Sequence, residues 1–306
     1  MEQQIDHGEP RTSTVFPGYP FRSHFLDLDG VRLHYVDEGS GPPVVMLHGN
    51  PTWSYYYRDL ARALSDTHRV IVPDHVGCGL SDKPDDGRYE YRLRRRVQDV
   101  ETLLERLEVR ADVTLVVHDW GGMIGLGWAV RHPERLKRLV VLNTAAFRLP
   151  AAKPLPWSLR VCRATPLGPL LVRGLNAFSR AAVRWCVTRP LAPEVRQAYL
   201  APYDSWAHRI AVLRFVQDIP LRPGDPSYDL VCDVESRLER LRDVPLLICW
   251  GERDFVFDRH FLAGWRHRFP RAEVHSFADA GHLVLEDAGA QILPLVRAFL
   301  QKEPTP

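Results

Sequence analysis

A carboxylate occupies the point where a predicted strand turns sharply into a predicted helix. The apolar run Val113–Val117 leads into residues 118–122, whose sequence is HDWGG, and then into a helical pattern. This order of strand, turn and helix is that of a nucleophile elbow. Gly121 suits such a turn because two stretches of backbone approach closely there. Aspartate after a strand is also a common helix N-cap, so the prediction of Asp119 as a nucleophile depends on two further motifs.

An aspartate at this position determines the kind of reaction. A serine alkoxide suits attack on acyl carbon, whereas a carboxylate is a weak nucleophile that displaces a good leaving group from saturated carbon and forms an alkyl ester. If that ester is hydrolysed, a neutral histidine has to activate the attacking water. The sequence must therefore be searched for a histidine and for the acid that orients it.

Two later loops supply these groups in the chain order nucleophile, acid, histidine. His282 follows Gly281 in the loop after the last predicted strand, and Asp254 lies in the loop after the strand before it. Glu252 and Asp258 compete for the acid role, but Asp254 is better placed relative to the strand end. We predict that Asp254 holds the imidazole of His282 in one tautomer.

Two donors are predicted for the departing anion. The first is the side chain of Asn50, in the loop 47–53 (LHGNPTW) after an early strand, where donors can face developing negative charge. The second is the indole N–H of Trp120, which only donates. Asn50 can alternatively be a turn-forming residue before Pro51. Asn143, after a middle strand, can position groups but cannot carry the charge of the acid.

The elements that would position these side chains alternate along the chain. Short β-branched runs are followed by amphipathic segments of helical length, which is typical of a mostly parallel sheet with helices on both faces. Strands are predicted at Val31–Val36, Val44–Leu47, Val70–Pro73, Val113–Val117, Arg138–Leu142, Leu246–Trp250 and Glu273–Phe277. Helices are predicted at Trp53–Leu64, Tyr91–Leu107, Met123–Arg131, Arg259–Phe269 and Ala288–Phe299.

One segment interrupts this alternation. Residues 147–231 show no strand pattern and contain 11 of the 25 prolines. We predict a helical cap there, inserted between the two parts of a core, 1–146 and 232–306. The cap has 12 Arg and Lys against 5 Asp and Glu, so it is basic and the remainder of the chain is acidic. Either a solvated helix face or a docking surface for an acidic partner would explain the arginines Arg163, Arg173, Arg180 and Arg184.

Composition excludes several other classes of protein. The chain has 306 residues, 45% of them hydrophobic and 25% charged, as expected for a globular enzyme. A net charge of +2 gives no field that would recruit nucleic acid. The five cysteines form no CxxC pair, and we predict no metal site and no cofactor. The acidic N-terminus does not resemble a signal peptide, and no apolar run approaches the roughly 20 residues of a membrane span, so a cytoplasmic location is predicted.

The sequence resembles the haloalkane dehalogenase branch of the α/β-hydrolase superfamily in three segments, 48–53, 74–84 and 117–122. The resemblance implies an α/β-hydrolase fold with a mostly parallel eight-stranded sheet, helices on both faces and an inserted helical cap. From about residue 17 to 299, the chain is more specifically similar to the β-lactone decarboxylases of bacterial long-chain olefin biosynthesis. The segments that carry this second similarity are 121–125, 143–147 and 199–221.

This second resemblance implies a long-chain cis-3,4-dialkyl-oxetan-2-one substrate, split into a cis-alkene and carbon dioxide without hydrolysis. It also implies an assembly with a β-lactone synthetase and a ketone reductase. Backside attack by Asp119 on the oxygen-bearing ring carbon, followed by anti loss of carbon dioxide, gives the cis-alkene. Attack at the lactone carbonyl or a concerted fragmentation gives the same isomer. His282 then has no water to activate, which leaves it a positioning or electrostatic role.

Other functions share the elbow. A haloalkane dehalogenase would use the same five residues, and a catalytically silent binding module would keep the fold alone. An epoxide hydrolase would add tyrosine donors, for which Tyr199, Tyr203 and Tyr228 are available. Two alkyl chains require an apolar tunnel, and either tunnel lining or ordinary helix packing explains the cap residues Leu149, Leu155, Trp157, Leu170, Leu171, Phe178 and Trp206.

Overall fold

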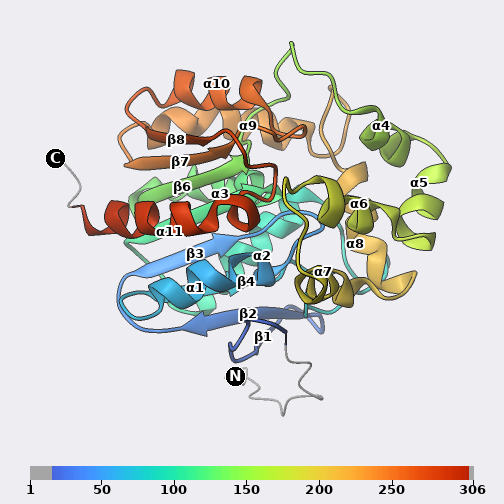
Figure 1. The fold of residues 1–306 in the computed structure, drawn as a ribbon, viewed down its shortest axis with the longest axis horizontal. Helices are drawn as coiled ribbons and strands as arrows, with labels where there is room; N and C mark the ends of the chain where they lie inside the picture. Colours follow the sequence, from blue (N-terminus) through green and yellow to red (C-terminus); the bar gives the residue numbers. More distant parts are fainter. Residues whose placement is uncertain (1–15, 303–306) are drawn as a thin grey trace.

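The computed structural model describes residues 16–302 and has eight strands in one sheet (Figure 1). The strands are β1 (His24–Asp27), β2 (Arg32–Glu38), β3 (Pro43–Leu47), β4 (Arg69–Pro73), β5 (Val113–Asp119), β6 (Leu136–Thr144), β7 (Leu246–Gly251) and β8 (Glu273–Phe277). Their order across the sheet is β1-β2-β4-β3-β5-β6-β7-β8. β2 is antiparallel to both of its neighbours, and every other pair is parallel.

Helices cover both faces of the sheet. One face carries α1 (Arg58–Leu64) and α11 (Val284–Gln301), and the other carries α2 (Leu93–Arg106), α3 (Trp120–Ala129), α9 (Tyr228–Arg237) and α10 (Arg259–Arg268). Each layer of helices packs its apolar side chains against the strands in a separate buried cluster. Short 3₁₀ turns complete this body at Ser54–Tyr57, Pro133–Arg135 and Leu238–Leu241.

The central strand shows why the sequence folds this way. β5 has the sequence VTLVVHD, and all seven of its residues are buried between β3 and β6. A strand covered on both faces reads as a continuous apolar run rather than an alternating one. α3, which follows it, is also buried on nearly every side, with nine of its ten residues inaccessible. The elbow between β5 and α3 is therefore held by the most deeply packed part of the molecule.

The predicted strands agree closely with the observed ones. All seven are present within two residues at each end, and β1 is the eighth strand of the sheet. β1 was missed because its four residues, HFLD, are too short to show a period and only half-buried. α3 begins at Trp120 and α11 at Val284, three and four residues earlier than predicted, and α9 was not predicted at all.

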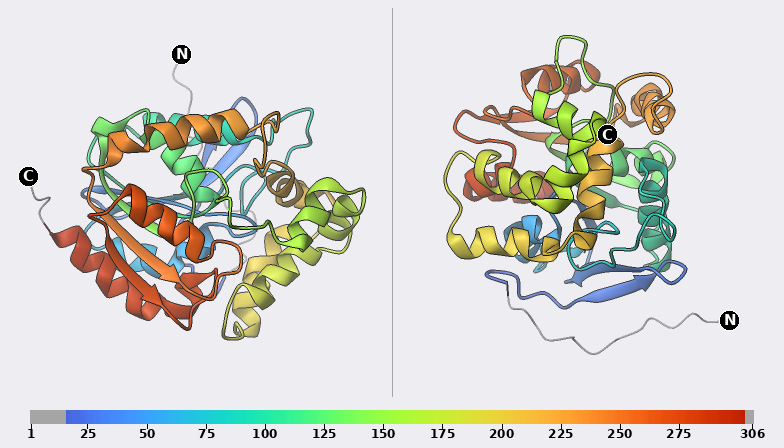
Figure 2. Two further views of the ribbon diagram at one scale, coloured as in Figure 1. Left: turned by 90° about the horizontal axis from the view of Figure 1, so that it is seen from above. Right: turned by 90° about the vertical axis from the view of Figure 1, so that its right-hand side faces the viewer.

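All of the regular secondary structure between β6 and β7 is helical. It contains α4 (Trp157–Ala164), α5 (Leu167–Pro169), a π-helical turn η3 (Leu170–Gly174), α6 (Ala177–Trp185), α7 (Pro193–Leu200), 3₁₀ turns at Ala201–Tyr203 and Ala207–Arg209, and α8 (Ile210–Gln217). These helices stand to one side of the sheet in the left view of Figure 2 and lie in front of it in the right view. Residue 231 lies inside α9, which packs on α3. The three-part division remains a prediction, and we propose that the cap ends before Tyr228.

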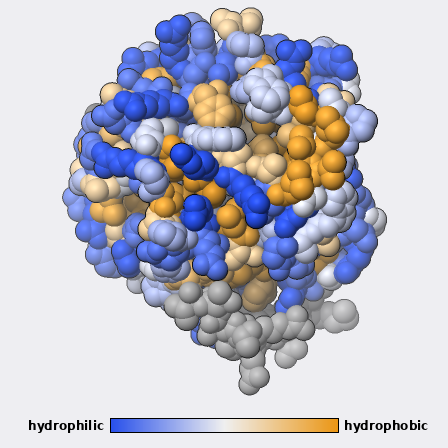
Figure 3. All heavy atoms as spheres, turned by 45° about the vertical axis from the view of Figure 1, so that its right-hand side comes forward, coloured by the Kyte–Doolittle hydropathy of each residue, from blue (hydrophilic) through white to orange (hydrophobic). Residues whose placement is uncertain are grey.

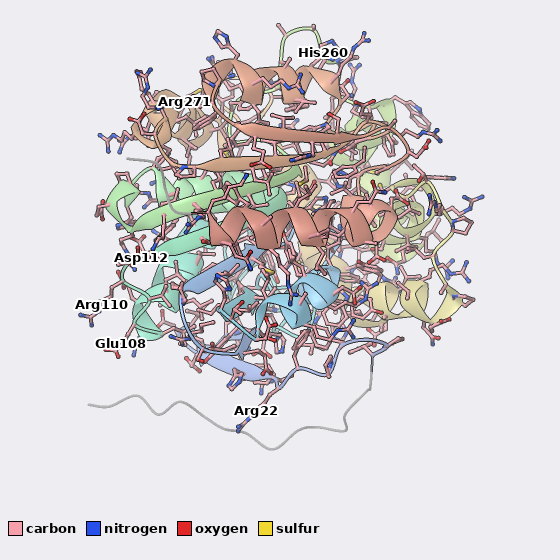
Figure 4. The ribbon with its side chains drawn as sticks, turned by 60° about the vertical axis from the view of Figure 1, so that its left-hand side comes forward. Arg22, Glu108, Arg110, Asp112, His260 and Arg271 are labelled. Carbon is pink, nitrogen blue, oxygen red and sulfur yellow. The ribbon has the colours of Figure 1, made fainter. Side chains whose placement is uncertain are left out.

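The opposite end of the molecule carries the turns that lead into the strands. Glu108, Arg110 and Asp112, between α2 and β5, project there in Figure 4, far from the cap helices. The cap therefore lies over the carboxyl ends of the parallel strands, where the loops after β3, β5, β7 and β8 meet. Within residues 16–302, no helix is long and apolar enough to cross a membrane. The N-terminal segment that carried the prediction against a signal peptide lies outside the described residues.

Candidate active site

The elbow places Asp119 in a strained backbone conformation. Its φ is +51° and its ψ −126°, a region that non-glycine residues rarely occupy. The hydroxyl of Thr144, at the end of β6, donates to the carbonyl oxygen of Asp119 and holds this conformation. A β-carbon on Gly121 would clash with the backbone carbonyl of Leu47, so the close approach inferred for this glycine is present.

Backbone donors fix one oxygen of the Asp119 carboxylate. The N–H of Asn50 donates to Oδ1 over 2.7 Å, and the N–H of Trp120 also donates to this carboxylate. Trp120 is the first residue of α3, so the charge lies at a helix N-terminus. The other oxygen, Oδ2, lies 3.6 Å from Nε2 of His282. Oδ2 is therefore the oxygen that the Asn50 N–H leaves unbound.

The structure brings Asp254, rather than its two competitors, to the histidine. Nδ1 of His282 lies 2.8 Å from Oδ2 of Asp254, and Asp254 is buried. Asn143 donates to the same oxygen over 3.0 Å, and the N–H of Val256 donates to Oδ1 over 2.7 Å. Asn143 thus positions the acid, in line with the role expected of it.

The two competing acids lie elsewhere. Glu252 is exposed to solvent. Asp258 caps the first turn of α10 through the N–H of His260 and pairs with Nζ of Lys153 over 3.0 Å. Neither carboxylate has an interaction with His282.

Burial and charge act in opposite directions on the two reacting groups. Burial raises the pKa of Asp119, although the His282 imidazole and the two backbone donors oppose this rise. Burial alone would lower the pKa of His282, but the carboxylates of Asp254 and Asp119 outweigh it and raise that pKa above its ordinary value. The two carboxylates therefore stabilise the protonated imidazole relative to a histidine in solution.

Asn50 and Trp120 both border the cavity beside Asp119. Nδ2 of Asn50 donates one hydrogen to the carbonyl of Val212 over 3.2 Å, which leaves its second hydrogen for another acceptor. The indole of Trp120 packs against Phe215, with ring centroids 5.2 Å apart. The backbone N–H of Asn50, which no side-chain pattern could indicate, is the group that binds Asp119.

The cavity above Asp119 encloses about 1100 Å³ of empty space, including the part that is open to solvent, and its lining is almost entirely apolar. Core and cap both contribute to its wall. Three of the seven predicted tunnel residues, Leu149, Leu155 and Phe178, line it. The other four do not, and Trp157, Leu170 and Trp206 project into solvent instead. Further apolar lining comes from residues that were not singled out: Met123, Phe147, Leu159, Ala182, Val216, Ile219, Leu221, Phe257 and Phe261.

Two supporting features were missed by the sequence analysis. Phe257 stacks on the imidazole of His282, with centroids 5.8 Å apart and ring planes 18° apart. The apolar run that follows Asp254 was the available signal for it. The second feature is Asp74, which is fully buried, binds the N–H of Ser54 and pairs with Nδ1 of His34 over 2.9 Å. It supports the loop of Asn50 from behind.

Comparison with known proteins identifies the family to which this chain belongs. The family model for the α/β hydrolase fold matches residues 42–289. The chain belongs to the α/β-hydrolase family. A haloalkane dehalogenase of Agrobacterium tumefaciens C58 superimposes with a TM-score of 0.81 at 29% identity, covering 91% of this chain and 96% of that one.

Closer relatives define the branch of the family. A cis-3-alkyl-4-alkyloxetan-2-one decarboxylase of Shewanella oneidensis is 58% identical, covering 94% of this chain and 90% of that protein. A protein of the same name from Xanthomonas campestris is 50% identical, covering 95% and 99%. The chain is therefore a member of the family that contains these decarboxylases. Within residues 16–302, no group of three or more His, Cys, Asp or Glu is placed to hold a metal ion.

Proposed function

We propose that the protein converts a cis-3-alkyl-4-alkyloxetan-2-one into a cis-alkene and carbon dioxide, with Asp119 as the nucleophile. One observation carries the proposal: a buried carboxylate with one free oxygen opens into a large apolar cavity between core and cap. The names of the two relatives that are at least half identical supply the substrate class. An apolar cavity suits alkyl chains, and a carboxylate suits attack on saturated carbon.

In the first step, Oδ2 of Asp119 attacks the ring carbon that bears the lactone oxygen. A bond forms between Oδ2 and this carbon, and the carbon–oxygen bond of the ring breaks with inversion. The lactone oxygen leaves with the electron pair as part of a carboxylate on the neighbouring carbon. The second N–H of Asn50 and the indole N–H of Trp120 are the donors for this new anion.

In the second step, the new carboxylate leaves as carbon dioxide. The electron pair of its carbon–carbon bond forms the double bond, and Asp119 leaves from the opposite side with the electrons of the ester bond. Inversion followed by anti elimination gives a cis-alkene from a cis-lactone. The two steps sum to lactone giving alkene and carbon dioxide, and no proton or water is consumed.

His282 acts on Asp119 through its charge in this scheme. The imidazolium, fixed by Asp254 and stacked on Phe257, stabilises the ionised carboxylate of Asp119 before attack and after its release. The apolar walls keep water from the alkyl ester. Hydrolysis would instead require a neutral His282 and a water beside it, which is the dehalogenase alternative.

The test is to incubate the purified protein with a cis-dialkyl β-lactone and, separately, with a haloalkane. Alkene is measured by gas chromatography and halide release by titration, with Asp119→Asn and Asp119→Ala beside the wild type. We expect alkene from the lactone, its loss in both variants, and little halide. Asp29→Asn is a matched control, because Asp29 is exposed and asparagine tolerates its positive φ.

Halide release without alkene would establish the dehalogenase instead. Undiminished turnover in Asp119→Asn, with deamidation back to aspartate excluded by mass, would refute the nucleophile. The cytoplasmic location and the assembly with a β-lactone synthetase and a ketone reductase remain predictions of the sequence.

A further inference from the structure

The outer face of the cap carries most of the large apolar side chains that the fold leaves in solvent. Seven such side chains are exposed within residues 16–302, and six of them lie in the cap. Trp157 and Trp185 are the most exposed, at 78% and 68%. The other four are Leu167, Leu170, Leu175 and Trp206. Figure 3, in which the cap side comes forward, shows apolar patches beside strongly hydrophilic residues.

The same part of the chain lacks acidic residues. Residues 145–193 contain eight Arg and Lys but no Asp or Glu, although the whole chain has 38 Asp and Glu among 306 residues. Three of these eight cations reach carboxylates outside the segment: Arg148 pairs with Glu235, Lys153 with Asp258 and Arg163 with Asp225. The segment therefore has a positive charge that nothing within it can neutralise.

Five of the arginines have no ion pair with a carboxylate, and four of these five are exposed. Arg160, Arg180, Arg184 and Arg189 are exposed, and no acidic group of residues 16–302 lies within ion-pair distance of their side chains. Exposed arginines without an ion pair are complementary in charge to an anionic surface. Because Arg160 shares α4 with the exposed Trp157, and Arg180 and Arg184 share α6 with the exposed Trp185, that surface must accept both charge and apolar area.

Helices α4 and α6 each present one side to the cavity and another side to solvent. Leu159 of α4 and Phe178 and Ala182 of α6 line the cavity. On their other sides the same helices expose the cap face, which we define as Trp157, Arg160, Arg180, Arg184 and Trp185. The cavity wall is therefore one helix thick, about 10 Å.

We propose that the cap face docks on an anionic lipid surface. Tryptophan is enriched at the boundary between water and hydrocarbon, and arginine is attracted to anionic headgroups. The two indoles, exposed by more than two thirds, match the interfacial position that tryptophan takes in a bilayer, and an acidic protein surface is the alternative that a vesicle-binding test distinguishes. A use for docking rests on the proposed function: the alkene has no polar group and partitions into a bilayer, which docking would bring to the outer side of the cavity wall.

The test is sedimentation of the purified protein with vesicles, in the absence of any substrate. Vesicles of phosphatidylglycerol and phosphatidylcholine are compared with vesicles of phosphatidylcholine alone, at low and high salt. We expect binding to the anionic vesicles that weakens with salt. The triple variant Arg160→Gln, Arg180→Gln and Arg184→Gln should bind about a hundredfold more weakly, since each basic residue contributes roughly a factor of five.

A matched control removes the same charge elsewhere. Arg22→Gln, Arg110→Gln and Arg271→Gln change three arginines that lie away from the cap helices in Figure 4, and this variant should bind like the wild type. The double variant Trp157→Ser and Trp185→Ser should also bind the anionic vesicles more weakly than the wild type, at low salt and at high salt alike. Neither cap variant touches the cavity, so turnover of a short-chain lactone in solution should be unchanged.

Three results would overturn docking. They are no sedimentation with anionic vesicles, equal sedimentation with neutral ones, or equal loss in the control and cap variants. Retention of the purified protein on an immobilised acidic protein, without vesicle binding, would also overturn it and assign the face to a protein partner. Vesicle binding without any alkene from the lactone would support docking while the proposed function fails.

Discussion

Replacing His282 with glutamine tests whether this residue acts through its charge or as a base. Nε2 of His282 lies 3.6 Å from Oδ2 of Asp119, and both side chains are buried. Two unit charges about 4 Å apart interact by about 4 kcal/mol at an effective dielectric constant of about 20. This value is the upper limit of what the imidazolium can contribute, and it corresponds to a rate factor of about 10³.

The contact between His282 and Asp119 also determines in which direction the pH–rate profile should move in the variant. The pKa of Asp119 is already raised by burial, and the imidazolium opposes that rise. In His282→Gln the opposition is removed, so the pKa of Asp119 rises further. Less of the nucleophile is ionised at neutral pH, and the acid limb of the rate profile moves to higher pH. We expect alkene formation to fall by about 10² to 10³ near pH 7 and to recover partly in alkaline buffer.

The assay is alkene release from a cis-dialkyl β-lactone over a pH series, with intact-protein mass spectrometry of each mixture. His267→Gln is the control, because His267 is exposed on α10. A base has a different signature, because alkaline buffer would not restore activity in its absence. An acid limb that does not move would refute the electrostatic role.

Three other substitutions test residues that support the site or line its cavity. Gly121→Ala should lower kcat about a hundredfold, because its β-carbon would clash with the Leu47 carbonyl and shift Asp119; unchanged turnover would contradict this close packing. Ala182→Phe fills the cavity beside α6, so kcat/KM should fall about 10- to 100-fold for long-chain lactones and little for short ones, in a chain-length series. Asp74→Asn should lower the free energy of unfolding, measured in urea near pH 7, by about 3 kcal/mol or more, because the buried pair with His34 is lost. The pKa of Asp74 is lowered in the folded protein, so this difference should shrink as the pH falls below about 4.

The position of the three central residues could be predicted from the sequence because it follows from topology. Asp119, Asp254 and His282 lie just after β5, β7 and β8, and the carboxyl ends of parallel strands share one edge of a sheet. The chain order and the apolar strands therefore bring these side chains together without knowledge of any angle. Distance to the strand end does not select Asp254, because Glu252 directly follows β7 and Asp254 lies three residues beyond it; the structure decides, since Glu252 is exposed and Asp254 contacts His282.

The lining of the cavity could not be predicted in this way. The cap helices carry apolar residues on two sides, because one side faces the cavity and another faces solvent. Trp157 and Leu159 illustrate this: they lie two residues apart on α4, yet the first is exposed and the second lines the cavity. Periodicity identifies an apolar stripe but not what covers it, which depends on how the cap sits on the core. The backbone N–H of Asn50 was hidden for a simpler reason, since every residue has one.

The same carboxylate and imidazole would serve hydrolysis and decarboxylation, so the outcome depends on what the ester carries. An ester formed from a haloalkane has no internal way to leave Asp119 and must wait for water. An ester formed from a β-lactone carries a carboxylate on the next carbon, whose loss as carbon dioxide supplies the electrons that expel Asp119. The second path needs the protonated form of His282, which the carboxylates of Asp254 and Asp119 stabilise, because an imidazolium cannot activate water but does stabilise the departing aspartate. In the proposed reaction, the charge of one histidine and the apolar lining of the cavity therefore replace the general base of a hydrolase.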